Sequence, residues 1–149
     1  PGMLDIAKEK IASDKVNFEL VDITQDWTFA KPPYDLVTFS LMLEHIENLA
    51  PIFEKLKTAI KDNGYVYISE LHPFKQYAGS KARFDIGNGE QFLDCFIHHV
   101  SDFTHIASMH GFKIIIIKEY FDDNDKSNIP RLLTLLFQKV QCITQILYY

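Results

Sequence analysis

The sequence is poor in the features that define several large classes of protein. Its 149 residues contain two cysteines, Cys95 and Cys142, so no disulfide framework is expected and a reducing compartment is favoured. No apolar run approaches the roughly 18 to 20 residues of a membrane span, and the first residues show no signal-peptide pattern. We therefore expect a cytoplasmic protein with no membrane partner.

Basic residues are also in the minority. Lysine and arginine number 15 against 20 acidic residues, which gives a formal charge of −5. Nucleic-acid binding depends largely on clustered basic side chains that neutralise phosphates, so no nucleic-acid partner is expected. The sequence contains neither a P-loop nor a nucleophile elbow, and no motif supports a dehydrogenase.

The composition that remains is that of an ordinary globular domain. Hydrophobic residues make up 47% of the chain and charged residues 23%, and a chain of this length suits one domain with one core. We assign residues 1–140 to that domain. Residues 141–149 form an apolar tail whose origin the sequence leaves open.

The clearest pattern lies between Tyr34 and Glu70. An apolar strand over 35–40 is followed by a loop, by an amphipathic helix that begins after Asn48 and ends at Gly64, and by a second apolar strand. The separation of the two strands leaves room for the crossover helix that a parallel pair requires. Units of this kind bind ligands at the carboxyl ends of their strands.

The flanking segments predict further elements around this unit. Helical spacing predicts a helix over 3–11, and alternation predicts a strand over 16–23. The polar and aromatic run over 74–88 predicts a long excursion or an irregular hairpin. Ser101 is the predicted N-cap of a helix that ends at Gly111.

The last part of the chain predicts two more strands. Residues 112–117 form a nearly continuous apolar run, which is typical of a strand buried on both faces. Residues 131–140 form another apolar run, and no helix lies between the two. We therefore predict an antiparallel hairpin at one edge of an otherwise parallel sheet.

The order and spacing of these elements resemble the class I S-adenosylmethionine-dependent methyltransferases between Gly2 and Val140. The resemblance is carried by the phrases GMLDIAKEKI, ELVDI, YDLVTFSLMLEHIEN and LKTAIKDNGYVYISE, and by HGFKIIIIKEYF with NIPRLLTLLFQKV. It implies an α/β, Rossmann-like fold with a mostly parallel sheet and an antiparallel C-terminal hairpin. It also implies S-adenosylmethionine as the cofactor and a small molecule as the methyl acceptor.

The resemblance implies roles for residues that follow the predicted strands. Asp22 would accept a hydrogen bond from the adenine amino group, and the backbone of Ile23 would contact the edge of the ring. Phe39, Ser40 and Leu41 would lie near the methionine part of the cofactor. The alternatives are an ordinary turn aspartate at Asp22 and strand-end packing at the other positions.

The same resemblance places the acceptor beside residues further along the chain. His45 and His99 are the candidate bases for the proton of the acceptor, because the pKa of imidazole suits proton transfer near neutral pH. An ordinary surface histidine is the alternative for His45. The candidates for acceptor binding are Glu44, His72, Tyr77, Arg83 and His98.

A metal site was weighed at the histidines around position 100. Zinc needs three or four converging ligands, and no matching spacing of cysteine and histidine accompanies His98, His99 and His105, so no metal site is predicted. Cys95 is interpreted as a thiol of the core or of a pocket wall.

The sequence departs from the family at its most characteristic segment. The glycine-rich loop that approaches the cofactor would precede Gly2, and the Gly87-Asn88-Gly89 segment follows no parallel strand and cannot replace it. We therefore expect the C-terminal part of a methyltransferase, with the first strands of the fold missing and cofactor binding weak or absent. The alternative is a non-catalytic binding or dimerisation module. The gap left by the missing strands would be closed either by re-pairing of the remaining strands or by a homodimer through exposed sheet edges.

Overall fold

A computed structural model describes residues 2–80, 83–85, 90–123 and 128–140. It contains a four-stranded sheet with the order β1-β2-β6-β5. β1 and β2 are parallel, and β6 is antiparallel to both of its neighbours, so β5 runs in the direction of β1 and β2. The predicted fold class, a mostly parallel sheet with an antiparallel hairpin at one edge, is confirmed. The four strands are β1 (Tyr34–Ser40), β2 (Ile60–Leu71), β5 (Phe112–Tyr120) and β6 (Leu132–Lys139).

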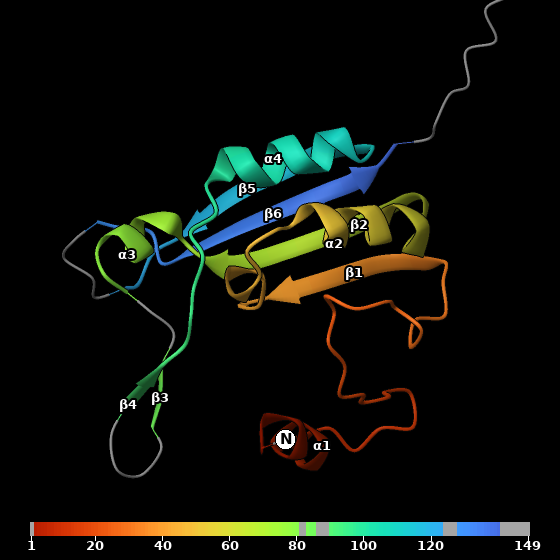
Figure 1. Cartoon of the computed structure of the whole chain (residues 1–149), viewed down its shortest axis with the longest axis horizontal. Coiled ribbons are helices and arrows are strands. Elements are labelled where there is room, and N and C mark those ends of the chain that lie inside the picture. The colour runs from red at the N-terminus through yellow and green to blue at the C-terminus, as the bar shows by residue number, and fades with distance from the viewer. Residues whose placement is uncertain (1, 81–82, 86–89, 124–127, 141–149) are drawn as a thin grey trace, which may run out of the picture.

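Two helices, α2 and α4, cover the same face of this sheet (Figure 1). Both were predicted from helical spacing, as was α1. None of the helices among the described residues is long and apolar enough to cross a membrane. The tail at 141–149 and the Gly87-Asn88-Gly89 segment lie outside the described residues. The remaining elements are α1 (Gly2–Lys10), the short 3-10 helix η1 (Leu43–His45), α2 (Ala50–Ala59), α3 (Pro73–Tyr77), the small hairpin β3 (Arg83–Asp85) with β4 (Glu90–Phe92), and α4 (Val100–Met109).

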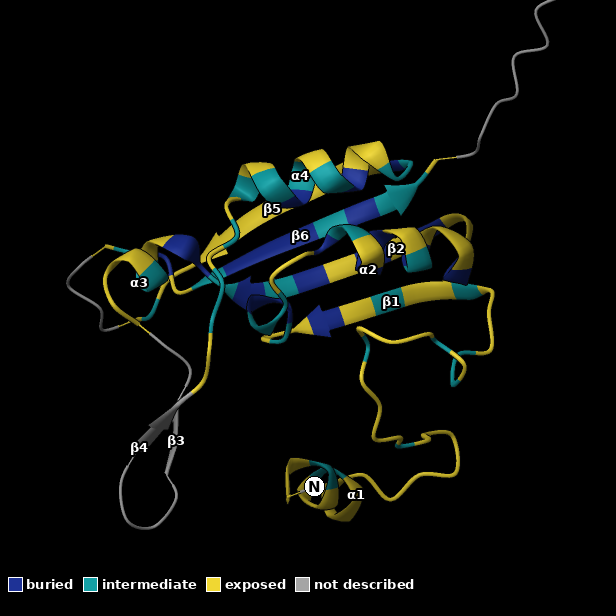
Figure 2. Ribbon diagram, in the orientation of Figure 1, coloured by how far each residue is buried: buried dark blue, intermediate teal, exposed yellow. Residues whose placement is uncertain are grey.

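The hydrophobic core lies between the sheet and the two covering helices (Figure 2). Phe53 of α2 packs edge-on against Phe112 of β5 and Phe137 of β6, with 6.2 Å between ring centroids in each pair. Val66 and Ile68 of β2 are fully buried beneath them. Full burial of one such side chain contributes about 1.5–3 kcal/mol, so this contact region supplies much of the stability.

The strand predicted over 16–23 is wrong. The segment has no regular secondary structure, and Val16, Leu20 and Val21 are 39%, 72% and 40% exposed. A strand is stable only when its backbone pairs with a neighbour, and no described strand lies beside this segment. β1 is consequently an edge strand of the described sheet, as it is drawn in Figure 1.

Gly64 does not end the helix that precedes it. α2 ends at Ala59, and the chain passes at once into β2, where Asn63 has a φ of 63°. Gly64 lies at an irregularity in the pairing of β1 with β2. A Cβ atom at Gly64 would lie 2.8 Å from Ile60 Cγ2 and 3.0 Å from Asp35 O. The glycine is therefore required by a close approach of two strands, and not by a helix stop.

The start of α4 also differs from the prediction. The N-cap is His99 and not Ser101, and the backbone N–H of His99 donates to Asp102 Oδ2 at 2.8 Å. A carboxylate in the first helical turn can accept from the capping residue, as it does here. The predicted end of the helix at Gly111 is confirmed, because Gly111 has a φ of 80° just beyond Met109.

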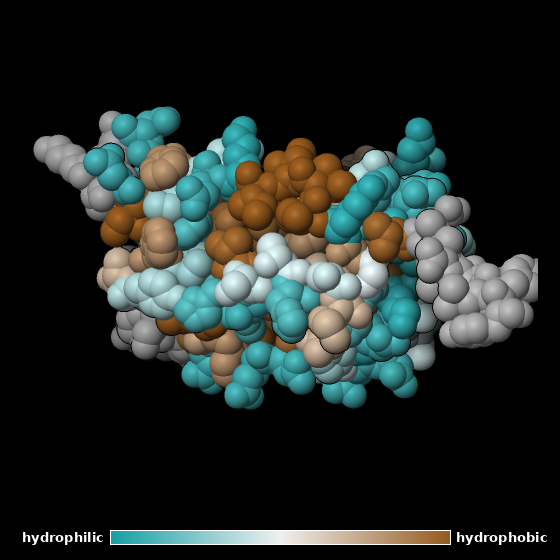
Figure 3. All heavy atoms as spheres, turned by 90° about the horizontal axis from the view of Figure 1, so that it is seen from above, coloured by the Kyte–Doolittle hydropathy of each residue, from teal (hydrophilic) through white to brown (hydrophobic). Residues whose placement is uncertain are grey.

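β5 was predicted to be buried on both faces, and that prediction is wrong. Its four isoleucines, Ile114 to Ile117, are 39% to 50% exposed. β6 returns between β2 and β5 and takes the inner position, so β5 pairs on one side only. Figure 3, which looks at the molecule from the side of α4 and β5, shows hydrophobic side chains gathered in one patch.

We predict that Gly64→Ala lowers the free energy of unfolding by about 1–3 kcal/mol, because the new methyl group overpacks a site closed by backbone atoms. Chemical denaturation of both proteins measures the difference. Gly2→Ala is the matched control, since no atom lies within 4 Å of its Cβ position. Equal stability of the Gly64 variant and the parent chain would contradict the close approach.

Candidate functional site

The candidate site lies at the carboxyl ends of the parallel strands β1 and β2. β1 ends at Ser40, and Leu41 then takes a left-handed conformation with a φ of 49°. The N–H of Leu41 donates to Ser69 O at 2.9 Å, which is the last backbone tie to β2 before the chain leaves the sheet. Ser40 and Leu41 are exposed, whereas Phe39 is 4% exposed and belongs to the core. Any contact of Phe39 with a ligand is therefore limited to its backbone or ring edge.

The loop that follows, residues 41–45, is held by one buried carboxylate. Glu70, at the end of β2, is 3% exposed. It accepts hydrogen bonds from the N–H groups of Met42, Leu43 and Glu44 at 3.1 to 3.4 Å. Burial raises the pKa of Glu70 above its usual range, the three N–H groups oppose that rise, and the nearby charge of Glu44 adds to it. The carboxylate thus fixes the first turn of the loop.

Asp22 lies in an exposed turn over residues 22–25. Its Oδ1 accepts from the backbone N–H of Thr24 at 2.9 Å and from the Thr24 hydroxyl at 2.7 Å. The hydroxyl of Thr24 is the main cause of a lowered pKa at Asp22. The side chain is therefore held in its ionised, hydrogen-bond-accepting form.

A lysine of α2 ties this turn to the sheet. Lys55 Nζ donates to the carbonyl oxygens of Ile23, Thr24 and Gln25 at 3.1, 2.7 and 2.6 Å. Trp27 Nε1 donates to the Ile23 oxygen as well, at 2.9 Å. The turn therefore keeps a fixed place beside β1 although no strand leads into it. The carbonyl of Ile23 is fully engaged within the protein.

An apolar hollow of about 300 Å³ lies between the 22–25 turn and the edge of β1. Ile23, Trp27 and Phe39 line it together with Met42 from the 41–45 loop. The structure thus brings two predicted cofactor residues, Ile23 and Phe39, to the same hollow. Mostly apolar walls are typical of small-ligand sites.

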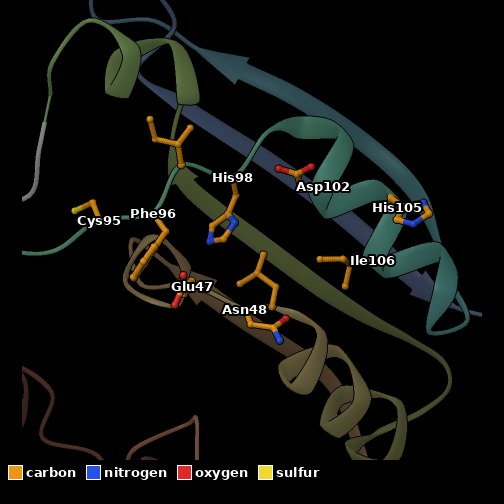
Figure 4. A pocket seen from close by; sticks show the side chains of 10 residues that line it. Glu47, Asn48, Cys95, Phe96, His98, Asp102, His105 and Ile106 are labelled. Carbon is orange, nitrogen blue, oxygen red and sulfur yellow. The ribbon is translucent and has the colours of Figure 1, made fainter.

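A second depression, the groove, lies between the loop before α2 and the segment that leads into α4 (Figure 4). Its volume is about 680 Å³. His98 joins the two sides, because its Nε2 donates to Ile46 O at 2.8 Å. The labelled side chains that line the groove are Glu47, Asn48, Cys95, Phe96, His98, Asp102, His105 and Ile106.

His45 and Glu44 lie on η1, and His45 Nδ1 is 3.9 Å from the sulfur of Cys95, which lines the groove. His45 Nδ1 is 3.0 Å from Asp94 O, and its Nε2 is 3.9 Å from Glu44 Oε1. Glu44 is only 6% exposed, and its Oε2 accepts from Gln76 Nε2 at 3.2 Å. The two residues predicted at the mouth of the site are therefore adjacent, with the histidine more accessible than the carboxylate.

Three further predicted site residues lie at α3 and at the start of α4, and a fourth lies in β3. His72 is 1% exposed, and its ring nitrogens contact Glu119 Oε1 at 3.0 Å and the N–H of Phe74 at 3.2 Å. These contacts give His72 a structural role as the N-cap of α3. Tyr77 and His99 are exposed and hydrogen bonded to each other. Arg83 lies in β3, and its side chain is outside the described part of the structure. The acceptor-site roles of all four stay predictions.

Sequence reasoning missed the residues that hold the site in place. Glu70 and Lys55 make the contacts that fix the loop and the turn, and Gln76 orients Glu44. The one available signal was an acidic residue at the end of an apolar strand, which Glu70 shares with Asp22. Lys55 resembles any exposed helical lysine in the sequence, because its three acceptors lie about 30 residues away.

The fold is that of an α/β domain with parallel strands, a class whose ligand sites lie at the carboxyl ends of the strands. A family model described as methyltransferase domain matches residues 3–115. The chain belongs to this methyltransferase domain family.

Solved structures of methyltransferases share the fold. A protein from Listeria monocytogenes, classed as an S-adenosylmethionine dependent methyltransferase, is 20% identical with a TM-score of 0.74, and the match covers 94% of this chain and 76% of that chain. An S-adenosylmethionine dependent methyltransferase from Mesorhizobium loti is 16% identical with a TM-score of 0.72, covering 93% and 76%. Magnesium protoporphyrin IX methyltransferase from Synechocystis PCC 6803, solved with bound SAH, is 16% identical with a TM-score of 0.59, covering 91% and 57%. No curated protein matches the chain.

We predict that Glu70→Ala lowers the free energy of unfolding by about 3 kcal/mol, since each buried N–H left without an acceptor costs about 1–3 kcal/mol. Urea denaturation measures this loss. Hydrogen exchange at the amides of Met42, Leu43 and Glu44 should accelerate in the same variant. Glu54→Ala, whose side chain is 60% exposed, is the control and should stay within about 0.5 kcal/mol of the parent. Unchanged exchange at the three amides would show that another group holds the loop.

Proposed function

We propose that this chain is the part of an S-adenosylmethionine-dependent methyltransferase that carries the acceptor side of the active site, and that the acceptor is a small molecule. One observation carries the proposal. The 22–25 turn and the end of β1, which are far apart in the sequence, line one apolar hollow. The family match supports methyl transfer as the reaction, and the relatives solved with SAH support the cofactor.

The hollow and its rim fit the adenosine part of the cofactor. A flat aromatic ring suits the apolar walls formed by Ile23, Trp27 and Phe39. Asp22, which precedes Ile23 in the chain, is held ionised. A carboxylate has about four lone-pair sites, so it can accept from an adenine amino group as well as from Thr24. Ser40 and Leu41 are exposed at the end of β1, where the methionine part would lie.

The groove suits the methyl acceptor. Its volume of about 680 Å³ lies within the range of about 300–1,000 Å³ that is common for small-molecule sites. S-adenosylmethionine supplies the methyl group when it is bound. The chain holds the acceptor in line and removes its proton. His45, which contacts Cys95 of the groove wall, is the first candidate base, and His99 beside Tyr77 is the second.

We infer that this 149-residue chain binds the cofactor weakly. The sequence has six glycines, but none of them forms a glycine-rich loop after an apolar parallel strand. Such a loop would present its backbone N–H groups to the cofactor at close range. The remaining contacts come from one side of the cofactor only. Weak binding follows from the lost hydrogen bonds and from the incomplete enclosure.

A second candidate is a non-catalytic dimerisation module derived from the same fold. The specific observation in its favour is the exposure of β5, whose isoleucines lie at an edge of the sheet. An exposed apolar edge strand pairs readily with another chain. Under this proposal a homodimer forms through the sheet edges, and the cofactor has no role.

We predict that SAH binds this chain with a dissociation constant of about 100 µM or weaker, equivalent to at most about 5.5 kcal/mol of binding free energy. An NMR titration measures both the affinity and the residues affected. Shift changes should appear at Asp22, Ile23, Ser40 and Leu41. Asp22→Asn should weaken binding several-fold because the adenine amino group loses a charged acceptor, while Asp26→Asn, on the same loop, should not.

Two outcomes would contradict the proposal. Absence of shift changes at millimolar SAH, together with a stable dimer in light scattering, would favour the dimerisation module. Micromolar affinity for this chain would refute the inference of weak binding but would leave the methyltransferase assignment in place.

A further inference from the structure

Three side chains with metal-binding atoms meet beside the groove, and one of them, Cys95, lines it. They are Glu44 and His45 on η1, and Cys95 on the segment between β4 and α4. One ligand atom from each lies within 4.8 Å of the others. Cys95 Sγ is 3.9 Å from His45 Nδ1 although 50 residues separate the two in the sequence. The cluster is therefore a product of the fold and has no sequence motif.

The backbone around the cluster is firmly held. The N–H of Phe96 donates to Glu44 O at 2.7 Å, which ties the segment carrying Cys95 to η1. The N–H of His45 donates to Met42 O at 3.1 Å, and the Glu70 carboxylate holds the three residues before His45. The two elements that carry the side chains thus have little freedom to move apart.

The side chains of His45 and Glu44 each have a neighbouring group that fixes their orientation, as the hydrogen-bond partners of metal ligands do. Asp94 O lies 3.0 Å from His45 Nδ1, and Gln76 Nε2 donates to Glu44 Oε2. His45 presents Nδ1 toward Cys95 Sγ, at 3.9 Å, and Nε2 toward the Glu44 carboxylate. Glu44 Oε1, 3.9 Å from that Nε2, is the carboxylate oxygen on the same side.

The charges around the cluster of Glu44, His45 and Cys95 favour a bound cation. Glu44 is 6% exposed and Glu70 is 3% exposed, and Glu70 accepts from the N–H of Glu44 itself. A largely buried carboxylate is stabilised by a positive charge beside it. Among the described residues, a neutral amide and a histidine ring contact the Glu44 carboxylate.

We propose that Glu44, His45 and Cys95 bind a zinc ion. A carboxylate, an imidazole and a thiolate together form a donor set that suits Zn²⁺ and does not suit Mg²⁺ or Ca²⁺, which prefer oxygen alone. Tetrahedral bonds of about 2.0–2.3 Å place ligand atoms about 3.3–3.7 Å apart, so the most distant pair closes by about 1 Å on binding. The thiol proton is released to solvent as the zinc–sulfur bond forms.

Three protein ligands leave a fourth position of the zinc open. Cys95 also lines the groove, so the metal lies at the wall of the proposed acceptor site. A hydroxyl, thiol or amine of an acceptor that enters the open position becomes more acidic, because the metal stabilises the deprotonated form. This last step rests on the proposed function, whereas the metal site itself does not. His45 as a ligand would not be the base.

The test is a zinc titration of the reduced, chelator-treated chain against a chromophoric competitor, with no cofactor or acceptor present. We expect one zinc per chain and micromolar or tighter binding. Cobalt in place of zinc should give the absorption of a tetrahedral site with a thiolate-to-cobalt band. Cys95→Ser should abolish that band and weaken zinc binding at least tenfold, and Glu44→Gln should also weaken it at least tenfold.

Two matched variants serve as controls. Cys142→Ser removes the other cysteine and His105→Ala removes a histidine of the groove, and both should bind zinc as the parent does. Circular dichroism confirms that each variant is folded. Failure of the parent to bind at 1:1 stoichiometry, or equal affinity of the two cysteine variants, would overturn the proposal. Because no cofactor is present, a negative SAH titration has no bearing on this result.

Discussion

The carboxylate of Glu70 is the interaction on which the candidate site depends. It is buried at the end of β2 and accepts from three consecutive backbone N–H groups of the 41–45 loop. A buried charge is costly, and the raised pKa of Glu70 expresses that cost. The N–H groups offset part of it and are fixed in return. The left-handed turn at Leu41, and the placement of Glu44 and His45, follow from this one contact.

The same principle operates at the other side of β1 with the charges reversed. Lys55 of α2 donates to three carbonyl groups of the 22–25 turn. A cation there binds three backbone acceptors, just as the Glu70 carboxylate binds three backbone donors in the 41–45 loop. Both charged groups project from the regular βαβ unit and hold irregular segments against it. A rigid unit therefore positions flexible chain on both sides of the apolar hollow. This arrangement explains how a site can form where no strand leads into the 22–25 turn.

The sheet is packed on one face only within the described structure. α2 and α4 cover one side, while Leu36, Tyr65 and Tyr67 on β1 and β2 remain 36% to 51% exposed. A sheet normally buries at least one apolar face. Here the face that the helices do not cover also carries aromatic and aliphatic side chains. Exposed apolar surface of this extent is typical of interaction sites. β5 resembles a buried strand in the sequence because its exposed side chains are apolar too.

The sequence by itself determined β1, β2, α2, α4 and the closing hairpin, because hydrophobic periodicity is a local property that neighbouring residues carry together. It also indicated that Ser40 and His45 follow an apolar strand and so lie near its carboxyl end. The tertiary structure alone decided that residues 16–23 form no strand and that β5 is exposed, because pairing and burial depend on which partners lie alongside. It alone brought Cys95 to Glu44 and His45, and three backbone N–H groups to Glu70. Contacts between residues far apart in the chain have no local pattern from which they could be predicted.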